Sequence, residues 1–316
     1  MPFEPEKQTR TAETEGYYHK IATQLLRRYE RETRQAWKAN PVDAARWLRE
    51  AIESRARSTH RKYVVALRWF LFEYGYNEAA QIIDEAQCKG PRKNSTVMHH
   101  LPRPDLDQLV GICLQKKGKY DELIGQWMVA NYIVGLRPCE WERVRFGHDG
   151  RGEKVLVVEN AKTTNGRGLG KTRTLLLEDL AKHEIEAIGT LIQRIRETMR
   201  VENLGFDRLQ QRCSERLHVL TRKLWPRRKK FPTLYSCRHQ LTRDLRSSGV
   251  EPQMISALLG HSSDYTAPVY YGRAGRASGR SSHVGVDAEA AASVRKVYKH
   301  VRESPVGPKS DTTPKA

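Results

Sequence analysis

Apolar residues recur with a helical period from residue 17 to about residue 87. The clearest segment follows Ser58 and Thr59, either of which can act as an N-cap. Its apolar positions fall on one stripe of a 3.6-residue helix: Tyr63, Val64, Leu67, Phe70, Leu71 and Tyr74. The pattern predicts a helical domain over residues 17–90, preceded by a flexible polar arm over residues 1–16.

Basic side chains lie off this apolar stripe, at Arg61, Lys62 and Arg68. The whole chain is basic, with 56 Lys and Arg against 37 Asp and Glu, a net charge of +19. Such an excess suits a polyanionic partner, because basic clusters neutralise phosphates. Composition alone leaves a basic soluble protein with a solvated helix face as the alternative. The three residues are therefore candidate DNA contacts.

Residues 91–103 lie in a stretch of Gly, Pro and basic residues and are predicted to be a linker. A second domain follows over residues 104–302, and residues 303–316 are predicted to be disordered. Helices are expected at 105–116, 121–134, 179–201, 235–247, 252–259 and 287–302, and a Gly-rich hairpin joins strands 153–159 and 172–177. The fold class is mainly α with a small β-sheet.

Five scattered cysteines include no CxxC pair, so neither a zinc site nor a disulfide framework is predicted. The N-terminus lacks an apolar signal core, and no apolar run approaches the length of a membrane span. These features predict a cytoplasmic protein, associated with the nucleoid in a bacterium. No metal and no other cofactor is expected.

The first candidate motif is GLRPCEW at residues 135–141. Gly135 can end one helix, and Pro138 can occupy the first turn of the next. Arg137 would then be held at a rigid junction, as bidentate phosphate binding requires. An arginine that caps a helix or pairs with Glu140 is the alternative.

Two further motifs follow, PTLYSCRHQL at residues 232–241 and SALLGHSSDYTAPVYYGR at residues 256–273. In the first, Tyr235 and Arg238 are three residues apart and share one helix face. In the second, a helix ends at Gly260, so His261 lies just past a helix terminus. A lone histidine there is usually structural. Tyr270 and Tyr271 follow within ten residues.

The order and spacing of these motifs, with a lysine on the hairpin between them, resemble the tyrosine recombinase (phage integrase) family over residues 105–275. NAKTTNGRGLGKTRTL and YYGR look most like a branch of bacterial integrase-like recombinases. The resemblance implies a two-domain architecture, in which a helical core-binding domain and a catalytic domain form a clamp around DNA.

The resemblance also implies roles for individual residues. Arg137 and Arg238 would bind the scissile phosphate, and His261 would donate a hydrogen bond or assist proton transfer. Lys162 would be the general acid, with Lys171 the weaker candidate. A tyrosine would attack to give a 3′-phosphotyrosyl intermediate without ATP. The implied partners are double-stranded DNA, a homotetramer on two duplexes, and accessory DNA-bending proteins.

Two positions depart from the common pattern. Tyr235 stands where most family members have His or Lys, but a phenol can still donate a hydrogen bond to phosphate, and the related telomere resolvases also carry Tyr there. The commonest spacing from His261 selects Tyr270 as nucleophile, whereas the YGR pattern of the resembled branch selects Tyr271. We take Tyr271 as the nucleophile and Tyr270 as the alternate.

Three alternatives stand beside this interpretation. One is a catalytically silent DNA-binding protein on the same fold, although every catalytic position holds a competent residue. Another is a telomere resolvase or type IB topoisomerase-like enzyme, which uses the same phosphotyrosyl chemistry. The third is a metal-dependent nuclease, for which the sequence offers no carboxylate cluster at ligand spacing.

Overall fold

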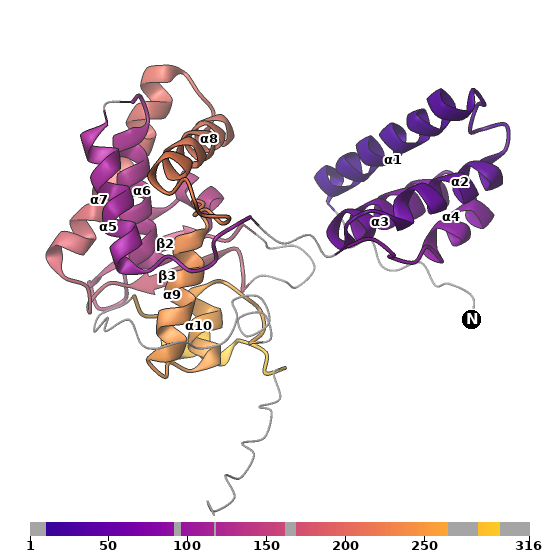
Figure 1. Cartoon of the computed structure of the whole chain (residues 1–316). Helices are drawn as coiled ribbons and strands as arrows, with labels where there is room; N and C mark the ends of the chain where they lie inside the picture. The colour runs from indigo at the N-terminus through magenta and orange to yellow at the C-terminus, as the bar shows by residue number, and fades with distance from the viewer. Residues whose placement is uncertain (1–10, 92–95, 117, 162–168, 265–283, 298–316) are drawn as a thin grey trace, which may run out of the picture. The chain divides into compact units, whose positions relative to one another are not determined.

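The computed structural model describes residues 11–91, 96–116, 118–161, 169–264 and 284–297. The chain divides into two compact units, Met1–Thr96 and Val97–Ala316, which are drawn in Figure 1. The division falls inside the predicted linker of residues 91–103. None of the described helices is both long and apolar enough to cross a membrane.

The described part of the N-terminal unit is formed by four helices: α1 (Ala12–Thr33), α2 (Pro41–Glu53), α3 (Arg57–Glu73) and α4 (Asn77–Asp84). Helix α3 packs against α1 and α4, and α2 packs against α4. Their apolar faces meet in one core that includes Leu26, Leu48, Leu67 and Ile83. Because most helical stability in proteins comes from packing of an amphipathic face, burial of these faces is what stabilises the unit.

Helix starts in this unit differ from the prediction. Thr11 caps α1 by accepting a hydrogen bond from the backbone N–H of Thr14, so residues 12–16 are helical rather than part of a flexible arm. Residues 1–10 lie outside the described residues. Helix α3 begins at Arg57 without a side-chain cap, which places Ser58 and Thr59 inside the helix. Local capping preference did not decide this start.

The C-terminal unit is built around α6 (Asp121–Val134), which is buried on nearly all sides. Helices α5 (Arg103–Gln115), α7 (Lys182–Glu202), α8 (Phe206–Leu224) and α9 (Ser236–Ser247) surround it. Trp127 and Met128 of α6 have no exposed surface. A helix that is apolar all round belongs in a core, and α6 provides the fixed frame from which the next segment projects.

A three-stranded antiparallel sheet adjoins these helices, in the order β1 (Arg145–His148), β2 (Lys154–Glu159) and β3 (Thr172–Leu176). Strands β2 and β3 confirm the predicted hairpin, with Glu159 opposite Thr172 at its loop end. Strand β1 was not predicted, because four residues of sequence RFGH show no alternation. The fold class, mainly α with a small sheet, is confirmed.

Several further elements differ from those that the sequence predicted. Helix α8 was missing from the prediction. Helix α12 (Ala288–Ala292) is much shorter than the helix expected over residues 287–302; Arg295 already bridges to Ser263. Residues 298–316, including the predicted disordered tail, lie outside the described residues. The end of the predicted linker packs on the C-terminal unit, since Met98 pairs with Phe231 and accepts from Ser236.

Candidate active site

Arg137 lies at the junction between α6 and the 3₁₀ helix η1 (Pro138–Glu142), as predicted. Gly135 ends α6 with φ of 63°, a backbone conformation that favours glycine, and a Cβ there would lie 2.6 Å from the Leu241 side chain. Arg137 Nη1 donates to Glu140 Oε1 at 2.6 Å, and its backbone N–H donates to Glu140 Oε2 at 2.8 Å. The junction thus fixes Arg137 and also pairs it with Glu140.

Arg238, the third residue of α9, is fully buried. Its Nη1 donates to the Gly135 carbonyl at 2.9 Å and its Nη2 to the Leu259 carbonyl at 2.6 Å. Its Nη2 also lies 3.3 Å from His261 Nε2. Arg238 therefore connects the end of α6 with the end of α10 (Pro252–Leu258) and brings His261 into the same site as Arg137.

His261 follows the turn that ends α10 and is only 5% exposed. Gly260 has φ of 66° and directs the chain into the site. Burial lowers the pKa of His261 to about 2, and the charges of Arg238 and Arg137 act in the same direction. The imidazole is therefore neutral near pH 7, with one N–H to donate.

One buried carboxylate, Glu140, meets three guanidinium groups. Arg173 Nη2 donates to Glu140 Oε2 at 2.8 Å, and Arg238 Nη1 lies 3.8 Å from the same oxygen. Burial raises the pKa of Glu140, but Arg173, Arg238 and Arg137 outweigh it and hold the pKa well below its usual range. We call Arg137, Glu140, Arg173 and Arg238 the Glu140 cluster; three positive groups and one negative group give it a net charge of +2.

Sequence reasoning missed Arg173 and its neighbour Asn160. Arg173 Nη1 donates to Asn160 Oδ1, and the Asn160 side chain donates to the carbonyls of Leu169 and Gly170. A signal was present, because strand alternation puts Arg173 on the same inward face as Leu175. A charged residue on the buried face of a strand needs a charged partner, and that partner is Glu140.

Of the remaining predicted catalytic residues, the structure describes Tyr235 and Lys171 only. Tyr235 precedes α9, with its ring centroid 6.0 Å from Arg238 Cζ. Lys171 is exposed. Lys162, Tyr270 and Tyr271 lie outside the described residues. The structure thus brings Arg137, Arg238 and His261 together, with Tyr235 beside Arg238.

The backbone leading to Lys162 can be followed as far as Ala161. The Ala161 backbone N–H donates to Glu140 Oε1 at 3.5 Å. The last described residue before the loop therefore adjoins the Glu140 cluster.

The predicted DNA contacts lie on α3 of the N-terminal unit. Arg61 and Lys62 are exposed there, whereas Arg68 Nη1 donates to Asp84 at 2.9 Å. The C-terminal unit carries a second basic segment, residues 222–230 (RKLWPRRKK), which the prediction overlooked. Its exposed basic residues are Arg222, Lys223, Arg227, Lys229 and Lys230.

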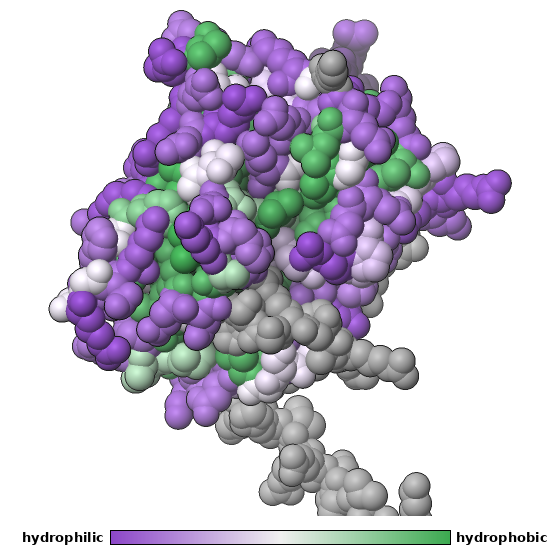
Figure 2. Space-filling view, turned by 90° about the vertical axis from the view of Figure 1, so that its left-hand side faces the viewer, coloured by the Kyte–Doolittle hydropathy of each residue, from purple (hydrophilic) through white to green (hydrophobic). Residues whose placement is uncertain are grey.

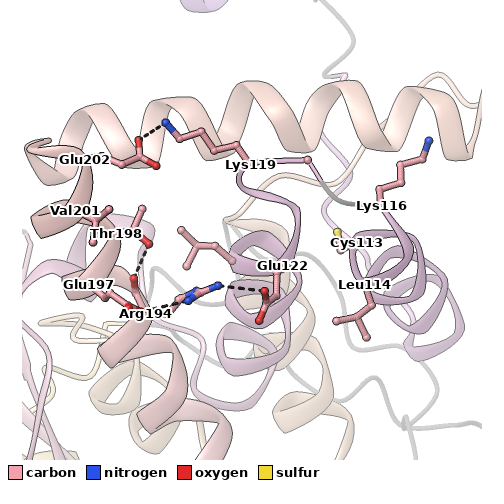
Figure 3. Close-up of a pocket in the computed structure, with 12 residues that line it drawn as sticks. Cys113, Leu114, Lys116, Lys119, Glu122, Arg194, Glu197, Thr198, Val201 and Glu202 are labelled. Atoms are coloured by element: carbon pink, nitrogen blue, oxygen red, sulfur yellow. Dashed lines mark hydrogen bonds and ion pairs between the residues drawn. The ribbon is translucent and has the colours of Figure 1, made fainter.

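An open groove of about 520 Å³ lies beside α7, lined by residues of α5, α6 and the segment between them (Figure 3). Leu114 and Val201 on its border are 65% and 69% exposed. Figure 2 shows hydrophobic patches on a mostly hydrophilic face. Five of the groove's six charged lining residues pair with one another, with Arg194 bound to Glu122 and Glu197 and Lys119 bound to Glu202; the sixth is the exposed Lys116.

The groove is therefore a poor phosphate site, and none of its lining residues belongs to the Glu140 cluster. Within the described parts of the chain, no three His, Cys, Asp or Glu side chains are grouped as a metal site would require.

No protein-family model and no curated protein sequence matches this chain. Solved structures of the Tn1549 transposon integrase do match. One, in complex with a circular intermediate DNA, has a TM-score of 0.51 at 12% identity over 84% of this chain and 91% of that chain. Another, in complex with transposon right end DNA, has a TM-score of 0.50 at 12% identity over 85% and 92%. The likeness at this identity concerns the fold: the chain has the fold of the tyrosine recombinases.

Proposed function

We propose that this protein is a site-specific DNA recombinase or integrase that cleaves and rejoins strands through a 3′-phosphotyrosyl intermediate and a Holliday junction, without metal or ATP. The observation that carries the proposal is the convergence of Arg137 and Arg238 on one buried carboxylate, Glu140, with His261 beside Arg238. The tyrosine recombinase fold is the second support.

The charge of this site suits phosphoryl transfer. A phosphodiester carries one negative charge, and its pentacoordinate transition state carries two. The Glu140 cluster has a net charge of +2, held in a low-dielectric site where charge stabilisation is strongest. Arg238 is fully buried without DNA, so we propose that DNA binding displaces the groups that cover it. Preorganised positive charge is what such a reaction needs from the protein.

In the cleavage step the phenolate oxygen of Tyr271 forms a bond to phosphorus, and the bond between phosphorus and the 5′-oxygen breaks. The phenol proton is lost to water, favoured by the neighbouring arginines. Lys162 gives a proton to the departing 5′-oxygen, leaving a free hydroxyl. Neutral His261 donates a hydrogen bond to the phosphate, and Tyr235 can donate another. Rejoining reverses these steps, since the new phosphodiester conserves the bond energy.

DNA binding would use both units. Exposed basic residues on α3 and in the segment 222–230 would contact phosphates, and the Tn1549 integrase structures were solved with DNA. We propose a homotetramer on two duplexes, assisted by accessory DNA-bending proteins. The protein would then act on chromosomal or mobile-element DNA at the nucleoid.

The test is covalent trapping from a pool of nicked duplexes of random sequence, in the presence of EDTA. The nick lets the fragment downstream of cleavage diffuse away, so the intermediate accumulates and its DNA can be sequenced. We expect an adduct with one enriched site and a 5′-hydroxyl on the released strand. Binding without any adduct would favour the catalytically silent alternative, and hairpin products would favour a telomere resolvase. Cleavage that requires magnesium would refute the phosphotyrosine mechanism.

A further inference from the structure

Arg173 is the most completely enclosed arginine in the Glu140 cluster after Arg238. It lies on β3, and its side chain is 2% exposed. Its guanidinium donates to Glu140 through both Nη1, at 3.2 Å, and Nη2, at 2.8 Å. Two parallel hydrogen bonds to one carboxylate are the strongest form of ion pair that arginine makes. The pair neutralises Glu140 from the side of the sheet.

Two other contacts fix the guanidinium in place. Its Nε donates to the Leu258 carbonyl at 2.9 Å, and its Nη1 also donates to Asn160. The turn after α10 is packed against this arrangement, since a Cβ on Gly260 would lie 2.5 Å from Asn160 Oδ1 and 3.0 Å from Arg173 Nη1. Lysine could not reproduce this pattern, because it lacks the planar fork of donors.

The charge balance shows what Arg173 contributes. Glu140 accepts hydrogen bonds from Arg137 and lies 3.8 Å from Arg238. Without Arg173 the carboxylate would be balanced by those two arginines alone, and the net charge of the cluster would fall from +2 to +1. The positive potential available to a phosphate would fall with it.

We propose that Arg173 is a positioning residue for strand cleavage: it neutralises and orients Glu140. The positive charge of Arg137 and Arg238 then stays available to the scissile phosphate, and the two side chains keep their geometry. This inference rests on the proposed recombinase function. It assigns a role to a residue that does not itself touch DNA.

The test compares Arg173→Met, which keeps an unbranched apolar stem and removes the charged guanidinium, with the wild type on two substrates. One is the nicked duplex with an ordinary phosphodiester at the selected site, and the other carries a neutral methylphosphonate there. We expect Arg173→Met to form adduct about 10²-fold more slowly on the phosphodiester, the loss typical of one charge-stabilising group. On the methylphosphonate the deficit should largely disappear, because the reaction there develops less negative charge.

A second variant separates charge from folding. The double variant Arg173→Met/Glu140→Gln restores the net charge of +2, so it should cleave the phosphodiester faster than Arg173→Met alone, a non-additive result. Arg143→Met is the matched control, since Arg143 is an exposed arginine at the end of η1 that pairs with Glu142 and Glu159. It should leave the ratio between the two substrates unchanged.

The outcomes distinguish this inference from the proposed function. If the wild type forms no adduct on any duplex, the proposed function fails. If the wild type reacts and Arg173→Met cleaves the phosphodiester at the wild-type rate, the positioning role is wrong. Equal losses on both substrates, with no recovery in the double variant, would likewise overturn it and leave Arg173 a structural residue.

Discussion

Arg137 and Arg238 hold unlike positions although both are proposed to bind one phosphate. Arg137 retains some exposure, and its side chain donates to Glu140. Arg238 has no exposed surface and donates to two backbone carbonyls from different helix ends. Truncating Arg238 would leave buried carbonyls without donors, which costs about 1–3 kcal/mol each. Its substitution must therefore affect folding as well as chemistry, whereas that of Arg137 affects mainly chemistry.

We predict that Arg137→Ala slows covalent adduct formation by about 10²- to 10³-fold, because one transition-state charge contact is lost. DNA affinity should change little, since this side chain touches one phosphate among many. Single-turnover trapping and a binding titration measure the two quantities. Arg238→Lys, which keeps the charge, should lose both activity and thermal stability. Wild-type cleavage by either variant would refute the assignment of the two arginines.

Stability should fall in mild acid because two buried histidines stay neutral. Burial lowers the pKa of His239 to about 4, with His99 and Arg238 adding to the effect. A folded-state pKa below the unfolded value means that the unfolded chain binds protons first as the pH falls. The contribution of neutral His239 to the free energy of unfolding is therefore complete above about pH 6.5. It is lost progressively as the pH falls from there to the folded-state pKa of about 4.

His239→Gln should flatten this decline by up to about 1.4 kcal/mol per pH unit. Denaturant unfolding of the wild type and the variant at several pH values measures, for each protein, the slope of the free energy of unfolding against pH. Identical slopes would show that His239 does not remain neutral in the folded state. His261, whose pKa is lowered further, should account for a similar share of the remaining dependence.

The sequence predicted the residues whose geometry is set locally. Gly135 and Pro138 fix Arg137 through their own backbone preferences, and Gly260 does the same for His261. Arg173 was not predictable in this way, because its partners Glu140 and Leu258 lie 33 and 85 residues away along the chain. If Arg173 had been recognised as a residue on the buried face of a strand, a carboxylate partner could have been predicted for it.

Among the elements, the turn after α10 determines where His261 lies. Gly260 has φ of 66° and would collide with Asn160 if it carried a Cβ. Gly249, after α9, has φ of 77° but has no atoms within 4 Å of its Cβ position. The two glycines therefore share the same backbone strain and differ only in the collision.

We predict that Gly260→Ala and Gly249→Ala both destabilise the fold by about 1–2 kcal/mol through strain, and that Gly260→Ala alone strongly reduces cleavage. The collision must move either Asn160 and Arg173 or the turn that leads to His261. Thermal unfolding and adduct formation for both variants provide the comparison. Equal activity of the two variants would show that the turn does not set the catalytic geometry.

Element prediction succeeded where an apolar period was recognised, and failed where a period was overlooked or where tertiary contacts ended the element. Helix α6 and the hairpin of β2 and β3 followed their apolar periods. Helix α8 carries Phe206, Leu209, Cys213, Leu217 and Leu220 on its buried face, a period that was available but overlooked. Helix α12 ends early because the backbone of residues 294–297 turns to contact Ser262 and Asp264, a tertiary interaction that helical propensity does not reveal.

At the level of the molecule, each unit has its own apolar core. We predict that a fragment of residues 1–96 unfolds cooperatively and is helical by circular dichroism. It should bind DNA weakly and with strong salt dependence, because phosphate contacts release counterions. The whole chain should bind far more tightly, since tethering makes the second contact intramolecular.

An unfolded fragment would contradict the independence of the N-terminal unit. A fragment with the full affinity of the chain would contradict the proposed use of both units on DNA. The charge-reversed variant Lys62→Glu is a matched probe, since Lys62 is exposed on α3. It should weaken binding of both the fragment and the whole chain.

The covalent intermediate itself is tested by mapping the trapped adduct by mass spectrometry. Trypsin releases residues 247–273 as one peptide, which contains Tyr265, Tyr270 and Tyr271. We expect the 3′-nucleotide on Tyr271, and Tyr271→Phe should abolish the adduct while Tyr270→Phe retains a reduced one. A nucleotide on Tyr270 would move the nucleophile by one residue and keep the mechanism. Site-specific cleavage with no nucleotide on either tyrosine would contradict it.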